Sequence, residues 1–426
     1  MLSELSEDPQ DKTRYRSGSF TDNMKLPVHR WFRYSAGFSA EWAENVIRSV
    51  SNGSEIRILD PFCGSGTTLL SAAKAGVSSV GFEAHPFVAR IASIKLKTDV
   101  DLQELETTAD LILRRAKQLH PPQPVTSSDL LLKCYTPEAL SALEALRMAY
   151  VDAESANILG AASGHIWLAI TSILRECSGV GTAQWQYVLP NKTKARTREP
   201  YEAFEARIRM FLDDLCYAKD HLTAAGKVLR TDARNPDCSG GFDLVLTSPP
   251  YPNNYDYADA TRLEMTFWEE ISRWGDLQCA VRQYLIRSCS QHSAAEKLSL
   301  DALLADNTVA PIREELTAVC RKLDEVRQTK GGRKTYHTMV AAYFVDLAKV
   351  MTSLRGLVRP GGRLALMIGD SAPYGVYAPV DKWLGDLAIS SGFHSFDFEK
   401  VRDRNTKWKN RKHTVPLKEG ILWVEA

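Results

Sequence analysis

A predicted apolar strand that ends in two prolines constrains this chain more than any other stretch. Residues 242–246 read Phe-Asp-Leu-Val-Leu, and residues 248–251 read Ser-Pro-Pro-Tyr. Because proline lacks a backbone N–H and has a fixed φ, neither proline can continue a central strand. The chain must therefore leave the sheet rigidly at Ser248, with a hydroxyl group, an unpaired carbonyl group and an aromatic ring held nearly motionless. We expect such a corner to bind a planar substrate that carries an amine.

A second motif joins a short strand to a glycine-rich turn. Residues 56–59 predict the strand, residues 60–68 read Asp-Pro-Phe-Cys-Gly-Ser-Gly-Thr-Thr, and a helix is expected from about Thr67. A strand that runs through such a turn into a helix is typical of domains that cradle a nucleotide-like cofactor. Leu69 stands where a dinucleotide fingerprint has its third glycine, and no Gly-Lys-Ser/Thr follows. We therefore do not expect a phosphate-gripping loop.

An acidic residue follows the next predicted strand, residues 77–82. Glu83 lies 17 residues past Gly66, close to the position of the carboxylate that binds ribose hydroxyl groups in doubly wound domains. The alternative interpretation is a solvated strand end. The glycine-rich turn that precedes Glu83 favours the ribose-binding role.

Together the two motifs resemble those of the amino-methyltransferases, enzymes that use S-adenosyl-L-methionine (AdoMet) to methylate exocyclic amines of bases in DNA. The serine of Ser-Pro-Pro-Tyr, in place of aspartate or asparagine, resembles most closely the cytosine-N4 branch. The resemblance covers about residues 29–98, 226–273 and 336–426. It implies AdoMet as the cofactor and no metal.

The resemblance also implies which residues contact the cofactor. Phe38 and Ser39, just upstream of the turn, would meet the methionine end of AdoMet, although the aromatic residues around them are equally typical of a cluster that closes a sheet edge. Asp232, after the predicted strand 227–230, would meet the adenine amine or else form an Asx turn. The expected cofactor-binding residues are Phe38, Ser39, Asp60, Pro61, Phe62, Gly64, Gly66, Thr67, Thr68, Glu83, Asp232 and Ser248.

The expected catalytic residues are Ser248, Pro249, Pro250 and Tyr251. An exocyclic amine is a weak nucleophile because its lone pair is delocalised into the ring. The Ser248 hydroxyl oxygen and the Pro249 carbonyl oxygen can accept its hydrogens and draw it toward tetrahedral geometry, while Tyr251 stacks on the base. Positioning then supplies most of the rate gain, without a metal or a covalent step. A carbon-5 cytosine reaction would need a nucleophilic cysteine, and no Pro-Cys dipeptide occurs.

In duplex DNA the target nucleotide must be flipped out of the stack, which costs energy that phosphate contacts can offset. Two basic runs, residues 192–198 and 400–412, are candidates for these contacts, although each is also typical of an ordinary solvated loop. Asn254 follows the Ser-Pro-Pro-Tyr motif closely enough to border the base pocket. The expected DNA-binding residues are Lys192, Lys194, Arg196, Arg198, Asn254, Arg402, Arg404, Lys407, Lys409, Arg411 and Lys412.

The order of predicted elements indicates an α/β fold: a doubly wound, Rossmann-like methyltransferase sheet with a terminal antiparallel strand and two largely helical insertions. We divide the chain into a flexible arm (1–24), a methyltransferase domain (25–100, 225–273 and 335–426) and two insertions (101–224 and 274–334), either of which is a candidate for DNA recognition. Helices are expected at 40–50 with Ser39 as N-cap, 85–97, 105–119, 136–150, 157–175, 201–222, 259–273, 339–357 and 380–391. Further strands are expected at 363–368, after a turn at 359–362, and as an antiparallel pair at 393–398 and 420–424.

Composition bounds the setting of this chemistry. The net charge is +1 over 426 residues, so any DNA-binding surface must come from local clusters of charge. The eight cysteines are scattered without a Cys-x-x-Cys pair, which indicates reduced thiols rather than disulfides or a zinc site. No signal sequence or membrane-spanning run is expected. The sequence therefore predicts a soluble cytoplasmic protein with no membrane partner.

The leading hypothesis is a site-specific DNA methyltransferase that acts on the N4 amine of a flipped cytosine in duplex DNA. Its setting would be a restriction-modification or defence system, whose cognate nuclease or other proteins would be its partners. The alternatives are adenine-N6 methylation of DNA, methylation of a base amine in RNA, and a non-catalytic DNA-binding subunit that keeps the AdoMet fold.

Overall fold

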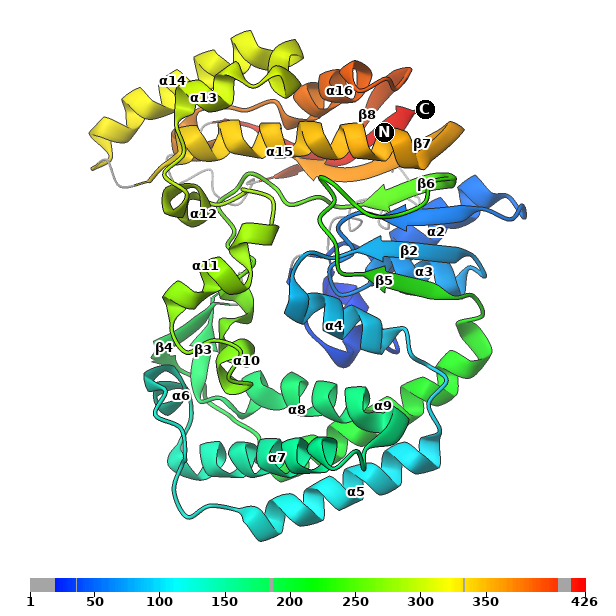
Figure 1. Cartoon of the computed structure of the whole chain (residues 1–426), viewed down its shortest axis with the longest axis vertical. Helices are drawn as coiled ribbons and strands as arrows, with labels where there is room; N and C mark the ends of the chain where they lie inside the picture. The colour runs from blue at the N-terminus through cyan, green and yellow to red at the C-terminus, as the bar shows by residue number, and fades with distance from the viewer. Residues whose placement is uncertain (1–19, 36, 184–186, 332–333, 405–414) are drawn as a thin grey trace, which may run out of the picture.

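A seven-stranded sheet forms the centre of the fold (Figure 1). The structure, a computed structural model, describes residues 20–35, 37–183, 187–331, 334–404 and 415–426. The strand order is β5-β2-β1-β6-β7-β9-β8. The first five strands are parallel, and β9 is antiparallel to both of its neighbours. The strands are β1 (Arg57–Asp60), β2 (Ser78–Phe82), β5 (Gly226–Leu229), β6 (Phe242–Thr247), β7 (Val358–Gly369), β8 (Ser395–Arg404) and β9 (Leu417–Glu425). The predicted doubly wound sheet with its antiparallel end is confirmed.

The order of the strands reverses between β1 and β6. From β1 the chain continues outward to β2 and β5, whereas β6 and β7 lie on the other side of β1. Ligands of doubly wound sheets bind at the carboxyl ends of the strands, next to such a switch point. The glycine-rich turn follows β1 and the Ser-Pro-Pro-Tyr motif follows β6, so the two motifs flank this point.

Helices cover both faces of the sheet because successive strand residues point to opposite faces. Leu244 and Leu246 of β6 pack with α2 on one face, and Val245 packs with α15 and α16 on the other. All three side chains are fully buried, and such burial is worth about 1.5–3 kcal/mol for each. The helices beside the sheet are α2 (Ala40–Ser51), α3 (Thr67–Lys74), α4 (Pro86–Lys95), α15 (Tyr336–Leu357) and α16 (Val380–Ser390). Ser39 caps α2, as predicted, by accepting a hydrogen bond from the backbone N–H of Trp42.

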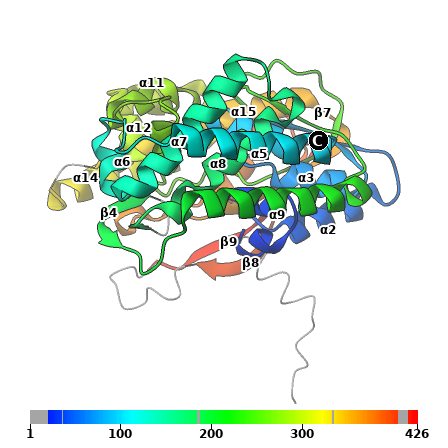
Figure 2. The ribbon, with the colours of Figure 1, turned by 90° about the horizontal axis from the view of Figure 1, so that it is seen from below.

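A helical layer lies at the end of the molecule away from α15 and α16, and Figure 2 shows α7, α8 and α9 side by side. It contains α5 (Leu102–Leu119), α6 (Asp129–Cys134), α7 (Pro137–Ser155), α8 (Ser163–Cys177), α9 (Pro200–His221) and the hairpin of β3 (Val180–Thr182) and β4 (Val188–Thr193). The four helices predicted here are confirmed, although α8 begins at Ser163 rather than at 157. Helix α6 and the β3–β4 hairpin were not predicted.

Asp214 of α9 ties this layer to the segment that precedes the sheet. Its buried carboxylate accepts hydrogen bonds from the Val28 N–H at 2.9 Å, the Trp31 indole N–H at 2.9 Å and the Arg30 guanidinium at 2.5 Å. The Trp31 ring also stacks on Phe211 of α9, with 4.3 Å between ring centroids. These contacts join residues that are far apart in sequence, and the spacing of apolar residues does not indicate them.

The described residues between β6 and α15 form five α-helices. Four of them are short, and α14 has 17 residues. They include α10 (Arg262–Phe267), α11 (Leu277–Ala280), α12 (Ser290–Ala295), α13 (Leu300–Ala305) and α14 (Arg313–Thr329). The helix predicted at 259–273 is wrong in its extent, because α10 ends at Phe267 and Glu269 adopts a left-handed backbone with φ 60°.

Two further expectations concern the N-terminal arm, residues 1–24, and the turn at residues 359–362. Residues 1–19 lie outside the described residues, but Thr21–Lys25 forms the 3₁₀ helix η1 rather than part of a flexible arm. It is held in place because the buried Asn23 side chain bonds to the Phe38 carbonyl and the Ala40 N–H. The predicted turn at 359–362 lies within the long strand β7, where it interrupts the pairing with β6: Val358 pairs with Phe242, Arg363 pairs with Leu244, and Gly361 between them has φ 77°.

All the cysteines of the chain lie among the described residues. All eight cysteines are free thiols. Among the described residues, no helix is long and apolar enough to cross a membrane, and no three metal-ligating side chains cluster in that part of the chain.

Candidate active site

The two sequence motifs meet at the carboxyl ends of β1 and β6, which pair in parallel. Asp60 ends β1, and its Oδ1 accepts hydrogen bonds from the Thr247 hydroxyl at 2.5 Å and from the Phe62 N–H at 3.0 Å. The Thr68 hydroxyl donates to the Leu246 carbonyl at 3.1 Å. Burial raises the pKa of Asp60 to about 6, and its Oδ2 has no hydrogen-bond partner among the described residues. The glycine-rich turn and the proline corner are therefore one rigid unit.

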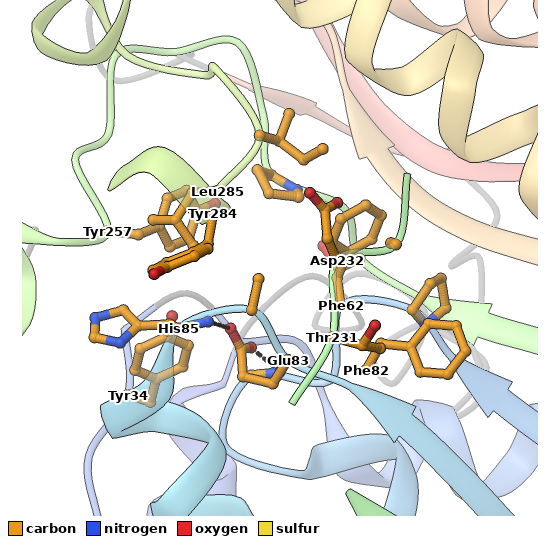
Figure 3. Close-up of a pocket in the computed structure, with 17 residues that line it drawn as sticks. Tyr34, Phe62, Phe82, Glu83, His85, Thr231, Asp232, Tyr257, Tyr284 and Leu285 are labelled. Carbon is orange, nitrogen blue, oxygen red and sulfur yellow. Dashed lines mark hydrogen bonds between the residues drawn. The ribbon is translucent and has the colours of Figure 1, made fainter. Parts of the chain in front are cut away.

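A cavity of about 630 Å³, including its open mouth, lies beside this unit. Figure 3 shows Glu83 near the middle of the lining, with Tyr284 and Leu285 above it and Asp232 to its right. Seven of the predicted site residues line the cavity: Pro61, Phe62, Gly64, Glu83, Asp232, Ser248 and Pro250.

Glu83 holds the glycine-rich turn against the end of β2. Its carboxylate accepts hydrogen bonds from the Gly64 N–H at 2.9 Å and from the His85 N–H at 2.7 Å (Figure 3). Burial raises the pKa of Glu83 to about 7 against these stabilising bonds. Gly64 has φ 51°, and a Cβ there would lie 3.1 Å from the Tyr34 ring. The turn can therefore approach Glu83 and Tyr34 only because residue 64 is glycine.

Asp232 lies at the cavity wall, but its carboxylate is already engaged. Arg234 donates from its backbone N–H to Oδ1 at 2.9 Å and from its guanidinium to Oδ2 at 2.7 Å. The same guanidinium lies 3.1 Å from the buried carboxylate of Asp346. The Asx-type turn that was the alternative interpretation is therefore present, and Asp232 also lines the cavity.

The Ser-Pro-Pro-Tyr corner presents Ser248 and Pro250 to the cavity and buries Pro249. Tyr251 is half-buried and is not among the described residues that line the cavity, and its hydroxyl donates to Glu419 Oε1 at 3.1 Å. Burial, followed by the Glu419 charge, raises the pKa of Tyr251 well above its usual value. The phenol therefore stays protonated and remains a hydrogen-bond donor.

Several predicted cofactor contacts lie behind the wall rather than in it. Phe38 packs edge-on against Trp42 in the core, with 5.4 Å between ring centroids, and the Ser39 oxygen is used to cap α2. Gly66 is the N-cap of α3, and Thr67 and Thr68 are buried in its first turn. None of these side chains is among the described residues that line the cavity.

Seven of the predicted DNA-binding residues are described, and five of these seven contact other parts of the protein. Lys192 and Arg196 are exposed. Lys194 donates to the Arg175 carbonyl, and Arg198 lies 3.7 Å from Glu176. Asn254 accepts two hydrogen bonds from Ser290, Arg402 pairs with Glu419, and Arg404 donates to the Asp370 carbonyl at 3.0 Å. Lys407, Lys409, Arg411 and Lys412 lie outside the described residues.

The cavity wall also includes residues that the sequence did not point to as site residues. They are Tyr34, Phe82, Ala84, His85, Thr231, Ala233, Tyr257, Tyr284, Leu285 and Ile286. The position of His85, two residues after Glu83, could have marked it. Nothing in the local sequence marks residues 284–286, which reach the cavity from the region between β6 and β7.

The chemistry of the wall suits AdoMet. Glu83 and Asp232 supply carboxylates, Phe62, Tyr34 and Tyr257 supply aromatic surface, and none of the described lining residues is lysine or arginine. A sulfonium nucleoside carries a positive charge and is attracted by carboxylates. Asp60 is buried behind the wall rather than in it, and its Oδ2 has no hydrogen-bond partner among the described residues.

Comparison with known proteins agrees with this chemistry. The family model for N6/N4 DNA methylases matches residues 6–93. The type II methyltransferase M.BsoBI of Geobacillus stearothermophilus is 25% identical over 95% of this chain and 87% of its own length. The type II methyltransferase M.AvaI of Nostoc sp. is 24% identical over 88% of this chain and 81% of its own length. The type II methyltransferase M.MjaII of Methanocaldococcus jannaschii is 34% identical over 91 residues, which cover 21% of this chain and 17% of that protein.

The doubly wound sheet, with its acidic cavity at the switch point, defines a methyltransferase of the AdoMet-dependent class. Over residues 6–93 the chain matches the DNA methylase family model, and over most of its length it is similar to two type II methyltransferases; this similarity and the fold imply AdoMet as the cofactor.

Proposed function

We propose that this protein is a site-specific, type II DNA methyltransferase that transfers a methyl group to the N4 amine of a flipped cytosine in duplex DNA. The observation that carries the proposal is the position of Ser248, at the end of β6, in the wall of the cavity that suits AdoMet. The full-length similarity to two type II methyltransferases supports the reaction class, and the serine in the first position of the motif supports cytosine.

The proposed catalytic step needs acceptors that are held in place, and the proton that the amine loses when its nitrogen is methylated leaves to solvent water past the Ser248 hydroxyl. The Ser248 hydroxyl oxygen and the Pro249 carbonyl oxygen accept the hydrogens of the amine, and its lone pair is thereby aimed into the cavity. Two prolines and the hydrogen bond from the Ser371 hydroxyl to the Pro252 carbonyl, 2.5 Å long, keep the corner from moving. When bound, AdoMet supplies an electrophilic methyl group on a sulfonium. The protein contributes position and a water-poor environment.

We assign the cofactor-binding roles from the same geometry. Glu83 would accept hydrogen bonds from the ribose hydroxyl groups, because each of its oxygens has a lone pair left after the bonds from Gly64 and His85. Asp232 would face the adenine end at the other side of the cavity. Asp60 would balance the positive charge of the cofactor from beneath the corner.

Duplex DNA would approach the open mouth of the cavity. Lys192, Arg196 and Arg198 are the exposed members of the predicted set among the described residues. Arg198 pairs with Glu176, so Lys192 and Arg196 are our candidates for phosphate contacts. A restriction or defence system is the setting that this activity implies, with a nuclease that cuts the same site when it is unmethylated.

The test is methyl transfer from labelled AdoMet to unmethylated genomic DNA, followed by digestion to nucleosides and base-resolution mapping. We expect N4-methylcytosine at one recurring sequence. Labelled N6-methyladenine would mean that the target base is adenine rather than cytosine. Labelling of tRNA but not of DNA would mean that the substrate is RNA. DNA binding without transfer to any nucleic acid would indicate a non-catalytic subunit and refute the proposal.

Ser248→Ala provides the matched variant. It removes one of the two acceptors, so we expect a decrease in kcat of about 10²-fold or more with little change in AdoMet affinity. Equal rates for the variant and the unmodified protein would show that the catalytic pocket is wrongly assigned.

A further inference from the structure

Strands β7, β9 and β8, at one edge of the sheet, place Gly369, Glu419 and Arg402 in one row. In the strand register, Gly369 of β7 pairs with Glu419 of β9, and Arg402 of β8 pairs with the same Glu419. This row lies next to the Tyr251 ring, although the sequence separates Tyr251 from Glu419 by 168 positions. The sheet therefore delivers a carboxylate, a cation and a glycine to one aromatic ring of the proposed catalytic motif.

Glu419 contacts the ring at its hydroxyl. The carboxylate is 4% exposed, accepts the Tyr251 hydroxyl at Oε1 and pairs through Oε2 with the Arg402 guanidinium. A buried carboxylate without a partner would be costly. Arg402 pairs with one oxygen of Glu419, and the other oxygen accepts the phenol hydrogen bond.

Arg404 contacts the ring on one face. Its guanidinium carbon lies 5.2 Å from the centroid of the Tyr251 ring, and its Nη1 is anchored on the Asp370 carbonyl at 3.0 Å. A Cβ at position 369 would lie 2.5 Å from Arg404 Nη1 and 3.1 Å from Tyr251 Cε2. Glycine at this position is what allows the guanidinium and the ring to approach the end of β7 together.

We propose that Glu419, Arg402, Arg404 and Gly369 form a holder for Tyr251, which fixes its ring with one face covered by Arg404 and the opposite face turned to the target base. This inference rests on the proposed function, because it assigns the stacking surface for the flipped base. It makes Glu419, Arg402 and Arg404 positioning residues for Tyr251 rather than contacts to DNA phosphates, the role that the sequence suggested for the two arginines.

The chain contains a matched control for this cluster. Arg363 of β7 and Glu425 of β9 also pair across neighbouring strands, with 3.1 Å between Nη2 and Oε1, and both are exposed at the other end of the sheet. Arg363→Ala and Glu425→Gln therefore change the same residue types in the same sheet without touching Tyr251.

The experiment measures kcat, the KM for unmethylated genomic DNA and the AdoMet Kd for the full-length protein and its variants. Loss of one hydrogen bond corresponds to about a 3–10-fold effect, so we expect Tyr251→Phe and Glu419→Gln each to lower kcat by that factor. The double variant should be no slower than the slower single variant: Tyr251→Phe removes the donor, and in Glu419→Gln the one amide oxygen is taken by Arg402, which leaves the phenol without its acceptor. Arg404→Ala should lower kcat or raise the DNA KM, with Arg404→Lys intermediate, and the AdoMet Kd and both control variants should stay within about twofold of the unmodified protein.

Three results would overturn the holder. Multiplicative losses in the double variant would mean that the Tyr251 hydroxyl and Glu419 act independently. A faster Arg404→Ala variant would mean that Arg404 occupies the face that the base needs. Variants that lower only the unfolding temperature, with unchanged kcat and DNA KM, would show a purely structural role. An unmodified protein that labels no DNA would refute the proposed function and this inference with it, whereas labelled DNA with unaffected variants would refute the inference alone.

Discussion

Glu83 offers the sharpest quantitative test of the cavity. Its carboxylate accepts two backbone hydrogen bonds, from Gly64 at 2.9 Å and His85 at 2.7 Å, while burial raises its pKa from 4.5 to about 7. The perturbation is Glu83→Gln, which keeps the shape of the side chain and removes its charge. The matched control is Glu144→Gln, because Glu144 is buried in α7 and accepts two backbone hydrogen bonds from Val125 and Thr126, away from the cavity.

The sign of the effect on stability follows from the raised pKa. Between about pH 4.5 and pH 7 the folded protein holds a proton on Glu83 that the unfolded chain has released. The contribution of Glu83 to stability is therefore highest below this window, falls as the pH rises through it and is lowest above it. At about 1.4 kcal/mol per pH unit, the loss amounts to roughly 3 kcal/mol. Glu83→Gln lacks this dependence, so its free energy of unfolding relative to the unmodified protein should rise by about 2–3 kcal/mol between about pH 5 and pH 8.

Cofactor binding should depend on the same ionisation. If the AdoMet cation favours the ionised carboxylate, binding releases the Glu83 proton, and the affinity of the unmodified protein should increase about 8-fold from about pH 6 to pH 7.5. In Glu83→Gln this dependence should disappear, and the Kd at about pH 7.5 should be about tenfold weaker or more, the value of a hydrogen bond to a charged group. Isothermal titration calorimetry measures both quantities. A Kd for Glu83→Gln within twofold of the unmodified value, with the same pH dependence, would refute the reasoning.

Two further predictions concern the turn and the anchor of the helical layer. Gly64→Ala places an alanine with a left-handed backbone against Tyr34 and should weaken AdoMet binding measured by calorimetry. The control is Gly53→Ala, at a position with φ 79° and no neighbour within 4 Å. It has the same backbone cost of about 1–2 kcal/mol and should leave AdoMet binding unchanged. Asp214→Ala leaves the buried donors of residues 28–31 without this acceptor, so we expect the free energy of unfolding, measured by chemical denaturation, to decrease by about 3–5 kcal/mol. A decrease below about 1 kcal/mol would contradict the assigned role of Asp214.

The sequence predicted the elements whose signals are local. The strand and turn at residues 56–68 and the strand that breaks into two prolines depend only on neighbouring residues, and both were placed correctly. The helix at 259–273 was placed too long, because nothing near Phe267 marks the left-handed Glu269 that follows the end of α10.

What the sequence determined by itself is the chemistry of the two strand ends, since proline geometry, glycine geometry and hydrophobic periodicity act over a few residues. Which distant side chains meet these strand ends was decided by the tertiary structure. Glu419 and Arg404 reach Tyr251, and Leu285 reaches the cavity, only because the strand order places β9 and β8 beside β7 and leads the chain after β6 back over the switch point. Arg404 shows the same limit: the charge of its side chain is visible in the sequence, but its contacts with the Asp370 carbonyl and the Tyr251 ring are a consequence of packing.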